Sequence, residues 1–433
     1  MTATDPTSGL AYLTAGLPGI GGTLKQTPED FLVEEQPLYE PKGEGEHVYL
    51  FLEKRELTTH DLIKRVARDF RVSKREIGHA GLKDKHAVTR QHLSIHLPEA
   101  NPEEEAKAVE RIECHPKIKV LWAERHGNKL RRGHHGGNRF VIKARGVEPT
   151  AVVRAKPIFD VIEKRGVPNY IGEQRFGYRG NSAELGALLL RSEYEAFLDE
   201  LLGTPGANDR PELAEGRARF RRGDYLGALE LWPKPLPYDR QALDALRQGK
   251  PPEAVVKSIA GSQRDFLVSA LQSAVFNTIL DGRVKAGTWD RLLPGDVAWK
   301  HDNRAKFTVD AQTAETENAP DGRVERFEIS PSAPLWGTDV VPASGDVLKT
   351  DRQALAAHGL AADLLETPHP LASVKGDRRS TRVAVADLDY SGGVDEHGPY
   401  LRCAFELPRG AYATMALREV MKPSTHADES PPC

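Results

Sequence analysis

The chain has 433 residues, of which 39% are hydrophobic and 28% charged, and its mean hydropathy is −0.50. This is the composition of a globular protein with room for about three domains. It has no apolar run long enough to cross a membrane and no signal-peptide pattern at its start, so we expect a cytoplasmic protein. Cys114, Cys403 and Cys433 form no Cys-x-x-Cys pair, which argues against structural zinc and disulfides. The net charge of −3 favours a nucleic-acid partner only if positive charge is concentrated on one face.

The first part of the chain alternates strand and helix patterns. Apolar residues alternate over 31–35 and run continuously over 48–52, which predicts two strands that could pair as a hairpin. Apolar residues at helical spacing over 58–70 predict an amphipathic helix. Basic side chains cluster on this helix and just after it: Lys64, Arg65, Arg68, Arg71, Lys74 and Arg75.

The next stretch, residues 78–91 (GHAGLKDKHAVTRQ), has the composition of an active-site loop. Asp84 is the only acid from residue 77 to residue 98, and it lies between Lys83 and Lys85. Nearby positive charge favours the ionised form of a carboxylate, and an ionised carboxylate held close to a substrate can act as nucleophile or base. A bare Lys-Asp-Lys turn would be a solvated surface feature. The local absence of acids, with a helix before and a strand after, favours an active site.

Residues 92–97 alternate and predict an amphipathic strand. His92 and His96 share one face of it but are too far apart for easy chelation, so we interpret them as exposed histidines near RNA. From 125 to 145 the chain holds no acid. Seven basic residues lie there, which favours a polyanion contact over a solvated loop: Arg125, Lys129, Arg131, Arg132, Arg139, Lys143 and Arg145.

Further features follow in the second half. Residues 167–177 have the composition of a structured loop, in which Asn169, Glu173, Gln174 and Arg175 could brace a site or contact RNA. Residues 203–255 carry no interpretable motif. Strands are predicted at 383–388 and 401–407 and a helix at 410–420, with a disordered tail over 423–433.

Two of these segments carry a family resemblance. Residues 81–89 (GLKDKHAVT) resemble one signature of the TruD family of tRNA pseudouridine synthases, and residues 169–177 (NYIGEQRFG) resemble the other. The two blocks occur in the family's order. The resemblance implies an enzyme that converts uridine to pseudouridine at position 13 of certain tRNAs, as a monomer, without metal, nucleotide or other cofactor.

The resemblance also implies roles for particular residues. Asp84 would be the catalytic carboxylate, and Lys25, in a run similar to the family's Leu-Lys-x-x-Pro-Glu-Asp-Phe motif, would hold it charged. The run at 136–140 (GGNRF) resembles a Gly-Asn-x-Phe motif, so Asn138 would bind substrate and Phe140 would stack on the target base. Tyr412 would also bind the substrate: it stands where the family pattern leads us to expect a phenylalanine that reaches the active site. The expected RNA contacts are Lys83, Lys85, Arg90, Lys129, Arg131, Arg132 and Arg175.

The fold implied is α+β. A pseudouridine synthase-type catalytic domain, with a mixed or antiparallel sheet and flanking helices, would comprise residues 1–165 and 386–433. An α/β TRUD domain would be inserted over 166–385.

Alternatives of other kinds stay open at this point. The chain could be a non-catalytic RNA-binding or RNA-chaperone protein that keeps the fold. It could be an N-glycoside hydrolase that uses the same carboxylate and releases uracil, or a synthase that acts on another class of RNA. Within the synthase hypothesis, Asp84 could attack C1′, add to the base, or remove a sugar proton.

Overall fold

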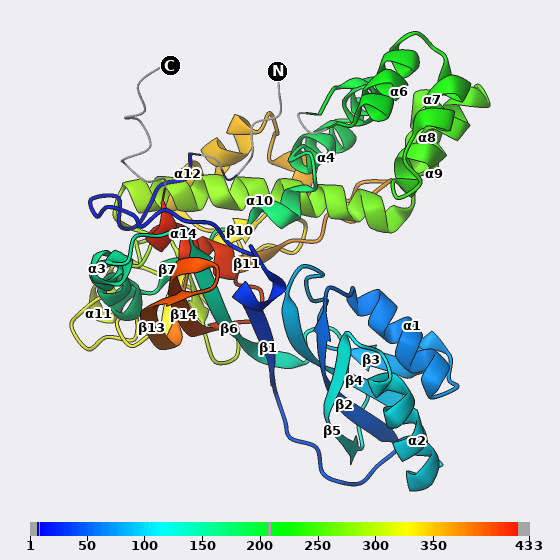
Figure 1. Ribbon diagram of the computed structural model, residues 1–433. Helices are drawn as coiled ribbons and strands as arrows, with labels where there is room; N and C mark the ends of the chain where they lie inside the picture. The colour runs from blue at the N-terminus through cyan, green and yellow to red at the C-terminus, as the bar shows by residue number, and fades with distance from the viewer. Residues whose placement is uncertain (1–6, 8, 100, 207–208, 423–433) are drawn as a thin grey trace, which may run out of the picture. The chain divides into compact units, whose positions relative to one another are not determined.

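The protein is described by a computed structural model that covers residues 7, 9–99, 101–206 and 209–422. The chain divides into two compact units, shown together in Figure 1. We call Thr14–Val167 with Val383–Cys433 the sheet unit, and Met1–Leu13 with Pro168–Arg382 the inserted unit. The tail predicted over 423–433 lies outside the described residues.

The start of the chain departs from the predicted division. The described residues before Thr14, residues 7 and 9–13, group with the inserted unit, whereas the prediction placed them in the 1–165 segment. The backbone N–H of Ala11 donates to the Asp281 carboxylate at 2.6 Å, and the Leu10 side chain is buried. These contacts explain why the segment is packed in that unit.

The sheet unit contains one mixed sheet of eight strands, in the order β13-β14-β6-β1-β4-β2-β5, with β3 also paired to β4. Only the β1–β4 pair is parallel among these pairings. The α+β class with a mixed sheet is therefore as predicted. The predicted hairpin of 31–35 with 48–52 is wrong, because β4 lies between β1 and β2. The strands are β1 (Phe31–Pro37), β2 (His47–Arg55), β3 (Ile77–His79), β4 (Val88–His96), β5 (Ile118–His126), β6 (His135–Arg145), β13 (Ala386–Asp395) and β14 (Gly398–Pro408).

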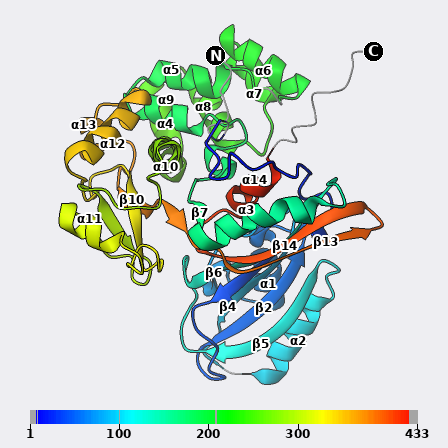
Figure 2. The same cartoon turned by 90° about the vertical axis from the view of Figure 1, so that its left-hand side faces the viewer.

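Helices build two hydrophobic cores against this sheet. One core joins α1 and α2 to β2, β3, β4 and β5, and the other joins α3 and α14 to β1, β6 and β14. Figure 2 shows α3 lying along β13 and β14. On α1, Thr58 accepts a hydrogen bond from the Asp61 N–H at 3.1 Å, and Leu62 and Val66 are fully buried, as the helical spacing predicts. The helices are α1 (Thr59–Asp69), α2 (Pro102–Glu113), α3 (Ala151–Arg165) and α14 (Ala413–Met421), with 3₁₀ turns η1 (Pro28–Asp30) and η2 (Lys74–Glu76).

Two short strands share one edge of β4, and this places the loop of interest. Glu34 of β1 is opposite Arg90, and His79 of β3 is opposite Leu93. The end of β1 and the end of β3 therefore meet along β4. Residues 80–87 connect β3 to β4 and leave the sheet at this junction.

The inserted unit is rich in helices and has one antiparallel sheet, in the order β11-β10-β8-β9. Its longest helix, α10 (Gly261–Lys285), packs against α4, and residues without an interpretable motif form α6 to α9. The strands are β8 (Val297–Lys300), β9 (Lys306–Thr308), β10 (Ile329–Leu335) and β11 (Asp377–Ser380), and β7 (Val167–Pro168) and β12 (Arg382–Val383) lie where the chain passes between units. The other helices are α4 (Ser182–Leu190), α5 (Tyr194–Leu198), α6 (Pro211–Arg221), α7 (Tyr225–Leu231), α8 (Pro237–Arg247), α9 (Pro252–Ser258), α11 (Ala311–Glu317), α12 (Gly345–Ala357) and α13 (Asp363–Glu366), with η3 (Glu173–Phe176) and η4 (Asp199–Gly203).

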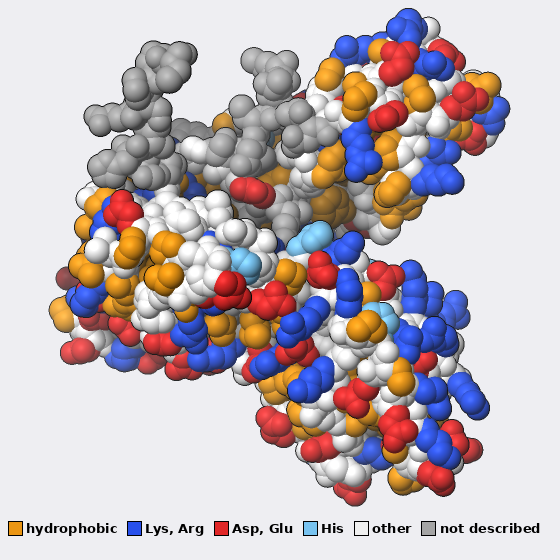
Figure 3. All heavy atoms as spheres, in the orientation of Figure 1, with side chains coloured by type: hydrophobic (Ala, Val, Ile, Leu, Met, Phe, Trp, Pro, Cys, Tyr) orange, Lys and Arg blue, Asp and Glu red, His pale blue; other side chains and the backbone are white. Residues whose placement is uncertain are grey.

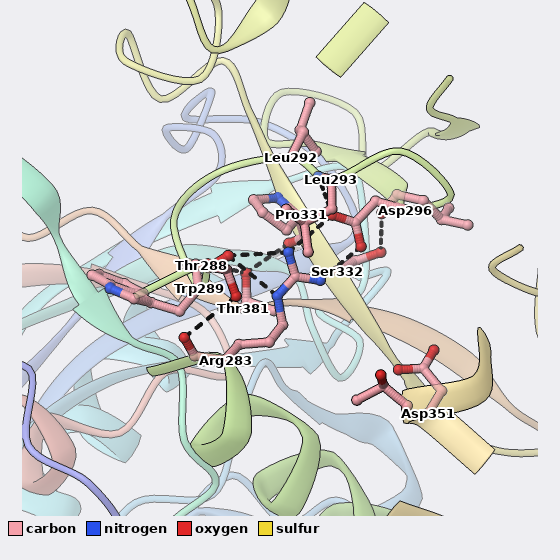
Figure 4. A network of polar contacts seen from close by, with 12 residues as sticks. Arg283, Thr288, Trp289, Leu292, Leu293, Asp296, Pro331, Ser332, Asp351 and Thr381 are labelled. Carbon is pink, nitrogen blue, oxygen red and sulfur yellow. Dashed lines mark hydrogen bonds and ion pairs between the residues drawn. The ribbon is translucent and has the colours of Figure 1, made fainter. Parts of the chain in front are cut away.

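A buried polar network joins α10 to this small sheet (Figure 4). The Arg283 guanidinium donates to both carboxylate oxygens of Asp296, at 2.6 and 2.9 Å, and one of those oxygens also accepts from the Leu293 N–H. The Thr381 hydroxyl donates to the Trp289 carbonyl at 2.7 Å. Charge-assisted and paired bonds of this kind satisfy polar groups that burial would otherwise leave unpaired.

Candidate active site

The expected catalytic residue lies in the loop at the β1, β3 and β4 junction and forms an ion pair. Oδ2 of Asp84 is 2.7 Å from Nζ of Lys25, and the two side chains are 34% and 27% exposed. The same ammonium lies 4.4 Å from the ring centroid of Phe31. The partial exposure leaves the pair within reach of a ligand.

A second lysine lies beneath the loop and was missed by the sequence analysis. Nζ of Lys54 donates to the Asp84 backbone carbonyl at 2.9 Å and to the Leu57 carbonyl at 2.6 Å. Burial lowers the pKa of Lys54 to about 8, although the charge of Asp84 acts to raise it. Strand alternation could have found this residue, because Lys54 follows the fully buried Leu50 and Leu52 at a period of two.

Lys83 is an internal residue of the site. Its ammonium lies 3.1 Å from Oε2 of Glu35 and donates to Oδ1 of Asn138 at 2.5 Å, and its side chain is only 6% exposed. The ammonium of Lys83 therefore faces partners inside the protein, and its RNA contact stays a prediction without support from this geometry.

Glu35 ties this ion pair to the sheet. Its carboxylate accepts from the backbone N–H of His92 at 3.2 Å and contacts Nδ1 of the same residue at 3.2 Å. Burial acts to raise the pKa of Glu35, but the His92 hydrogen bond and the Lys83 charge together hold it below its usual value. His92 is buried, which corrects its prediction as an exposed histidine. Glu35 shares the buried face of Phe31 and Val33, so alternation was the available signal for it.

The aromatic residue expected to stack on the base lies in the core beside this group. Phe140 is 7% exposed, with its ring centroid 6.4 Å from that of Phe31 and 5.7 Å from that of Phe405. The structure thus gives Phe140 a packing role that the sequence analysis did not assign. Its expected contact with a base stays a prediction.

Several basic residues that were expected to contact RNA or another polyanion have acidic partners within the fold. Arg90 pairs with Glu34 at 2.8 Å and with Glu53 at 3.0 Å, so its charge is balanced within the sheet and does not support the predicted RNA contact. In the acid-free segment 125–145, four of the seven basic residues have acidic partners from other parts of the fold. They are Arg125, Arg139, Lys143 and Arg145. The segment contains no acid itself, but acids from elsewhere in the fold lie beside it and balance much of its charge.

The remaining basic residues lie on a segment that runs beside the loop. Arg131 and Arg132 are exposed, and Lys129 donates to the backbone carbonyl of Arg75. The N–H of Gly133 donates to the Ala80 carbonyl at 2.8 Å, so this segment runs alongside residues 75–80. Figure 3 shows Lys and Arg side chains gathered over the part of the sheet unit that carries α1. We define the basic surface by its exposed members around this segment: Arg71, Lys74, Arg75, Arg131 and Arg132.

The other expected site residues have separate positions. Lys85 is exposed, next to Asp84 in the loop. Tyr412 is half-buried at the start of α14, and no hydrogen bond or ring contact found in the described residues joins it to Asp84. Arg175 belongs to the inserted unit, where its guanidinium lies 5.9 Å from the ring centroid of Phe266. The described residues contain no group of three or more His, Cys, Asp or Glu side chains placed to hold a metal ion. Within the same residues, no helix combines the length and apolarity needed to span a membrane.

The sequence comparisons decide the family. The model of the family described as tRNA pseudouridine synthase D (TruD) matches residues 7–420. The chain belongs to this family. The reaction of the TruD family is the isomerisation of uridine to pseudouridine in tRNA, so the predicted resemblance is confirmed.

Relatives of the TruD family match along nearly the whole chain. The tRNA pseudouridine synthase D of Geobacter metallireducens is 42% identical over 412 residues, covering 95% of this chain and 97% of the relative. The protein of the same name from Geobacter sulfurreducens is 42% identical over 414 residues, with 95% and 96% covered. A crystal structure described as TruD from Methanosarcina mazei has a TM-score of 0.77 at 28% identity, covering 95% of this chain and 96% of that one.

Proposed function

We propose that Asp84 is the carboxylate that carries out uridine isomerisation in this TruD family member. The observation that carries the proposal is the Lys25–Asp84 ion pair, at 2.7 Å, on a loop that is anchored to the sheet and open to ligand. A carboxylate held ionised can act on the glycosidic carbon or on the base.

The reaction moves C1′ of the ribose from N1 to C5 of the uracil. The N1–C1′ bond breaks, the C5–C1′ bond forms, the C5 proton is lost, and N1 gains a proton. Asp84 would act by attack on C1′, by addition to the base or by removal of a sugar proton, and each route needs the carboxylate in its ionised form. Lys25 donates to the Asp84 carboxylate, and the bond from Lys54 to the Asp84 carbonyl holds the backbone in place.

The basic surface supports tRNA as the substrate. Arg131 and Arg132 are exposed on a segment whose next residue, Gly133, bonds to the loop that carries Asp84. Phosphates held by these side chains would bring the RNA backbone close to the carboxylate. We propose uridine 13 of tRNA as the target and a monomeric, cytoplasmic enzyme.

Tritium release from 5-³H-uridine tRNA tests the role of Asp84. Wild type is expected to release tritium, and Asp84→Asn is expected to release none while binding tRNA with unchanged affinity in a filter assay. Asp389→Asn is a matched control, because Asp389, on β13, is also an aspartate with a basic partner at 2.7 Å, here Arg402. It is expected to retain wild-type release. Full release by Asp84→Asn would refute the proposal.

The same reaction distinguishes a synthase from an N-glycoside hydrolase. Digestion of the product RNA to nucleosides is expected to yield pseudouridine in amounts equal to the tritium released. Free uracil and an abasic site in the RNA would instead support hydrolysis.

A further inference from the structure

Leu82 stands out among the residues of the active-site loop. It lies two residues before Asp84, and 55% of it is exposed to solvent. Single exposed leucines are common on protein surfaces and need no explanation by themselves. The position of this one, beside the carboxylate and on an anchored backbone, is what calls for an explanation.

Hydrogen bonds fix the backbone on both sides of Leu82. Before it, the Ala80 carbonyl accepts from the Gly133 N–H at 2.8 Å, and the Gly81 carbonyl lies 3.2 Å from Nδ1 of His79. After it, the Lys83 N–H donates to the Thr59 hydroxyl at 3.0 Å, and the Asp84 carbonyl accepts from Lys54 at 2.9 Å.

The side chains that flank Leu82 in the loop strengthen this anchoring. Lys83 forms the internal ion pair with Glu35, and Ala80 and Ala87 are buried at the two ends of the loop. The loop is thus held against the sheet while the Leu82 side chain is left outside the core. An exposed apolar side chain on an anchored backbone is suited to contact a ligand.

We propose that Leu82 is the wedge that fills the space left in the RNA stack when the target uridine turns toward Asp84. A uridine in a stacked RNA cannot present its glycosidic carbon and C5 to a carboxylate, so it has to leave the stack. Apolar side chains inserted between bases unstack them and keep them apart. Leu82 therefore acts as a positioning residue for the unstacked state, and it takes no part in bond breaking.

The neighbours of Leu82 fit this role. Lys85 and His86 are exposed on the same loop. Burial lowers the pKa of His79, and Arg132 lies close enough for its positive charge to lower it further. Cationic side chains close to the wedge would hold the phosphates on either side of the displaced nucleotide. The proposal rests on the proposed function, because it assumes that Asp84 acts on a uridine in tRNA.

The first test measures base displacement without chemistry. A tRNA with 2-aminopurine next to the target uridine is titrated with Asp84→Asn, and the fluorescence is expected to rise as stacking is lost. The double variant Asp84→Asn with Leu82→Ala is expected to bind this tRNA, but the rise in fluorescence should be less than half of that with Asp84→Asn alone. Leu82→Met in the same background should restore it, because methionine is also long and apolar.

The second test compares two substrates in single-turnover tritium release with the otherwise wild-type enzyme. Leu82→Ala is expected to slow release from folded tRNA about 10-fold to 100-fold, since unstacking costs a few kcal/mol. On a short unstructured RNA of the same local sequence, the loss should be about 3-fold or less, because the base is already unstacked. The matched control is Leu226→Ala, a leucine of the inserted unit that is also 55% exposed, and it should match wild type on both substrates.

Each result bears on one proposal. Equal losses for Leu82→Ala on both substrates, or an unchanged fluorescence rise in the double variant, would overturn the wedge. Wild-type protein without tritium release on either substrate would instead refute the proposed function.

Discussion

The Lys25 ammonium lies 2.7 Å from the Asp84 carboxylate, and the backbone of Lys25 has a φ of 58°. This left-handed conformation is unfavourable for any residue but glycine, by roughly 1 kcal/mol. The ion pair is therefore presented from a strained position, and strain of this kind is often found at functional sites.

Two substitutions of Lys25 separate stability from activity. Lys25→Gly and Lys25→Met both remove the charge, so single-turnover rates should fall roughly 100-fold in each, the loss typical of one missing electrostatic partner. Lys25→Gly relieves the strain, so its free energy of unfolding should exceed that of Lys25→Met by about 1 kcal/mol in urea melts. Equal rates in wild type and both variants would argue against a role for the ion pair.

The buried Lys54 predicts an alkaline limit to activity. Its pKa of about 8 lies below the usual 10.5, so the folded protein loses this charge beneath the Asp84 loop as pH rises through 8. The single-turnover rate should fall above pH 8 in wild type. The unfolded state keeps the proton up to pH 10.5, so this residue adds to the free energy of unfolding as pH rises across that window. Deprotonation of Lys54 therefore does not destabilise the folded protein in this pH range, so unfolding through Lys54 would not explain a fall in the rate.

Lys54→Met tests this assignment because it keeps an unbranched side chain without charge. The single-turnover rate of Lys54→Met should be lower than that of wild type at pH 7 and should stay constant between pH 7 and 9. Lys85→Met, at an exposed position of the same loop, should keep the alkaline fall. An alkaline fall that persists in Lys54→Met would assign it to another group.

Neighbouring glutamates on β1 give a matched test of burial. Glu35→Gln leaves the Lys83 ammonium inside the protein without its charged partner, and should lower the free energy of unfolding by roughly 3 kcal/mol. Glu34→Gln removes a partly exposed partner of Arg90 and should change the free energy of unfolding by less than about 1 kcal/mol. Urea melts of the two variants measure the difference.

The Glu35 effect should also depend on pH. Because its pKa in the folded protein is held below 4.5, its stabilising contribution is present above that pH and is lost as pH falls through the lowered value. The difference in the free energy of unfolding between wild type and Glu35→Gln should therefore become smaller in urea melts below pH 4. A gap that widens on acidification would contradict the ion pair.

The basic surface predicts a change in salt dependence. The double variant Arg131→Ala with Arg132→Ala should bind tRNA more weakly, and the slope of log K against log salt should become shallower by roughly 1.5. Arg139→Ala is the control, because its partner Glu406 already balances its charge at 3.2 Å. An unchanged slope in the double variant would count against phosphate contacts at 131 and 132.

Sequence patterns predicted the local features of this site better than they predicted the ion pairs and hydrogen bonds between its residues. The loop around Asp84 and the helix that precedes it followed from composition and periodicity, and the family resemblance implied that Lys25 would approach Asp84, as the ion pair shows. The partners of Lys83 and Arg90 did not follow from either, because they lie on strands whose order in the sheet is not set by local sequence. Glu35 and Lys54 were missed for a different reason, since alternation was applied to apolar residues and not to the charged residues that shared their buried face.

The pairing of β6 with β14 has a consequence for synthesis on the ribosome. Strand β6 ends at Arg145, whereas β14, which pairs with it and brings Phe405 against Phe140, begins only at Gly398. Residues 168–382 emerge in between. Throughout that interval the nascent chain carries an open strand edge and an uncovered aromatic ring, the features by which unfinished chains associate with one another. The edge of β6 is therefore covered only after β14 has been made, and a chain that is released before that point would leave this edge open to aggregation.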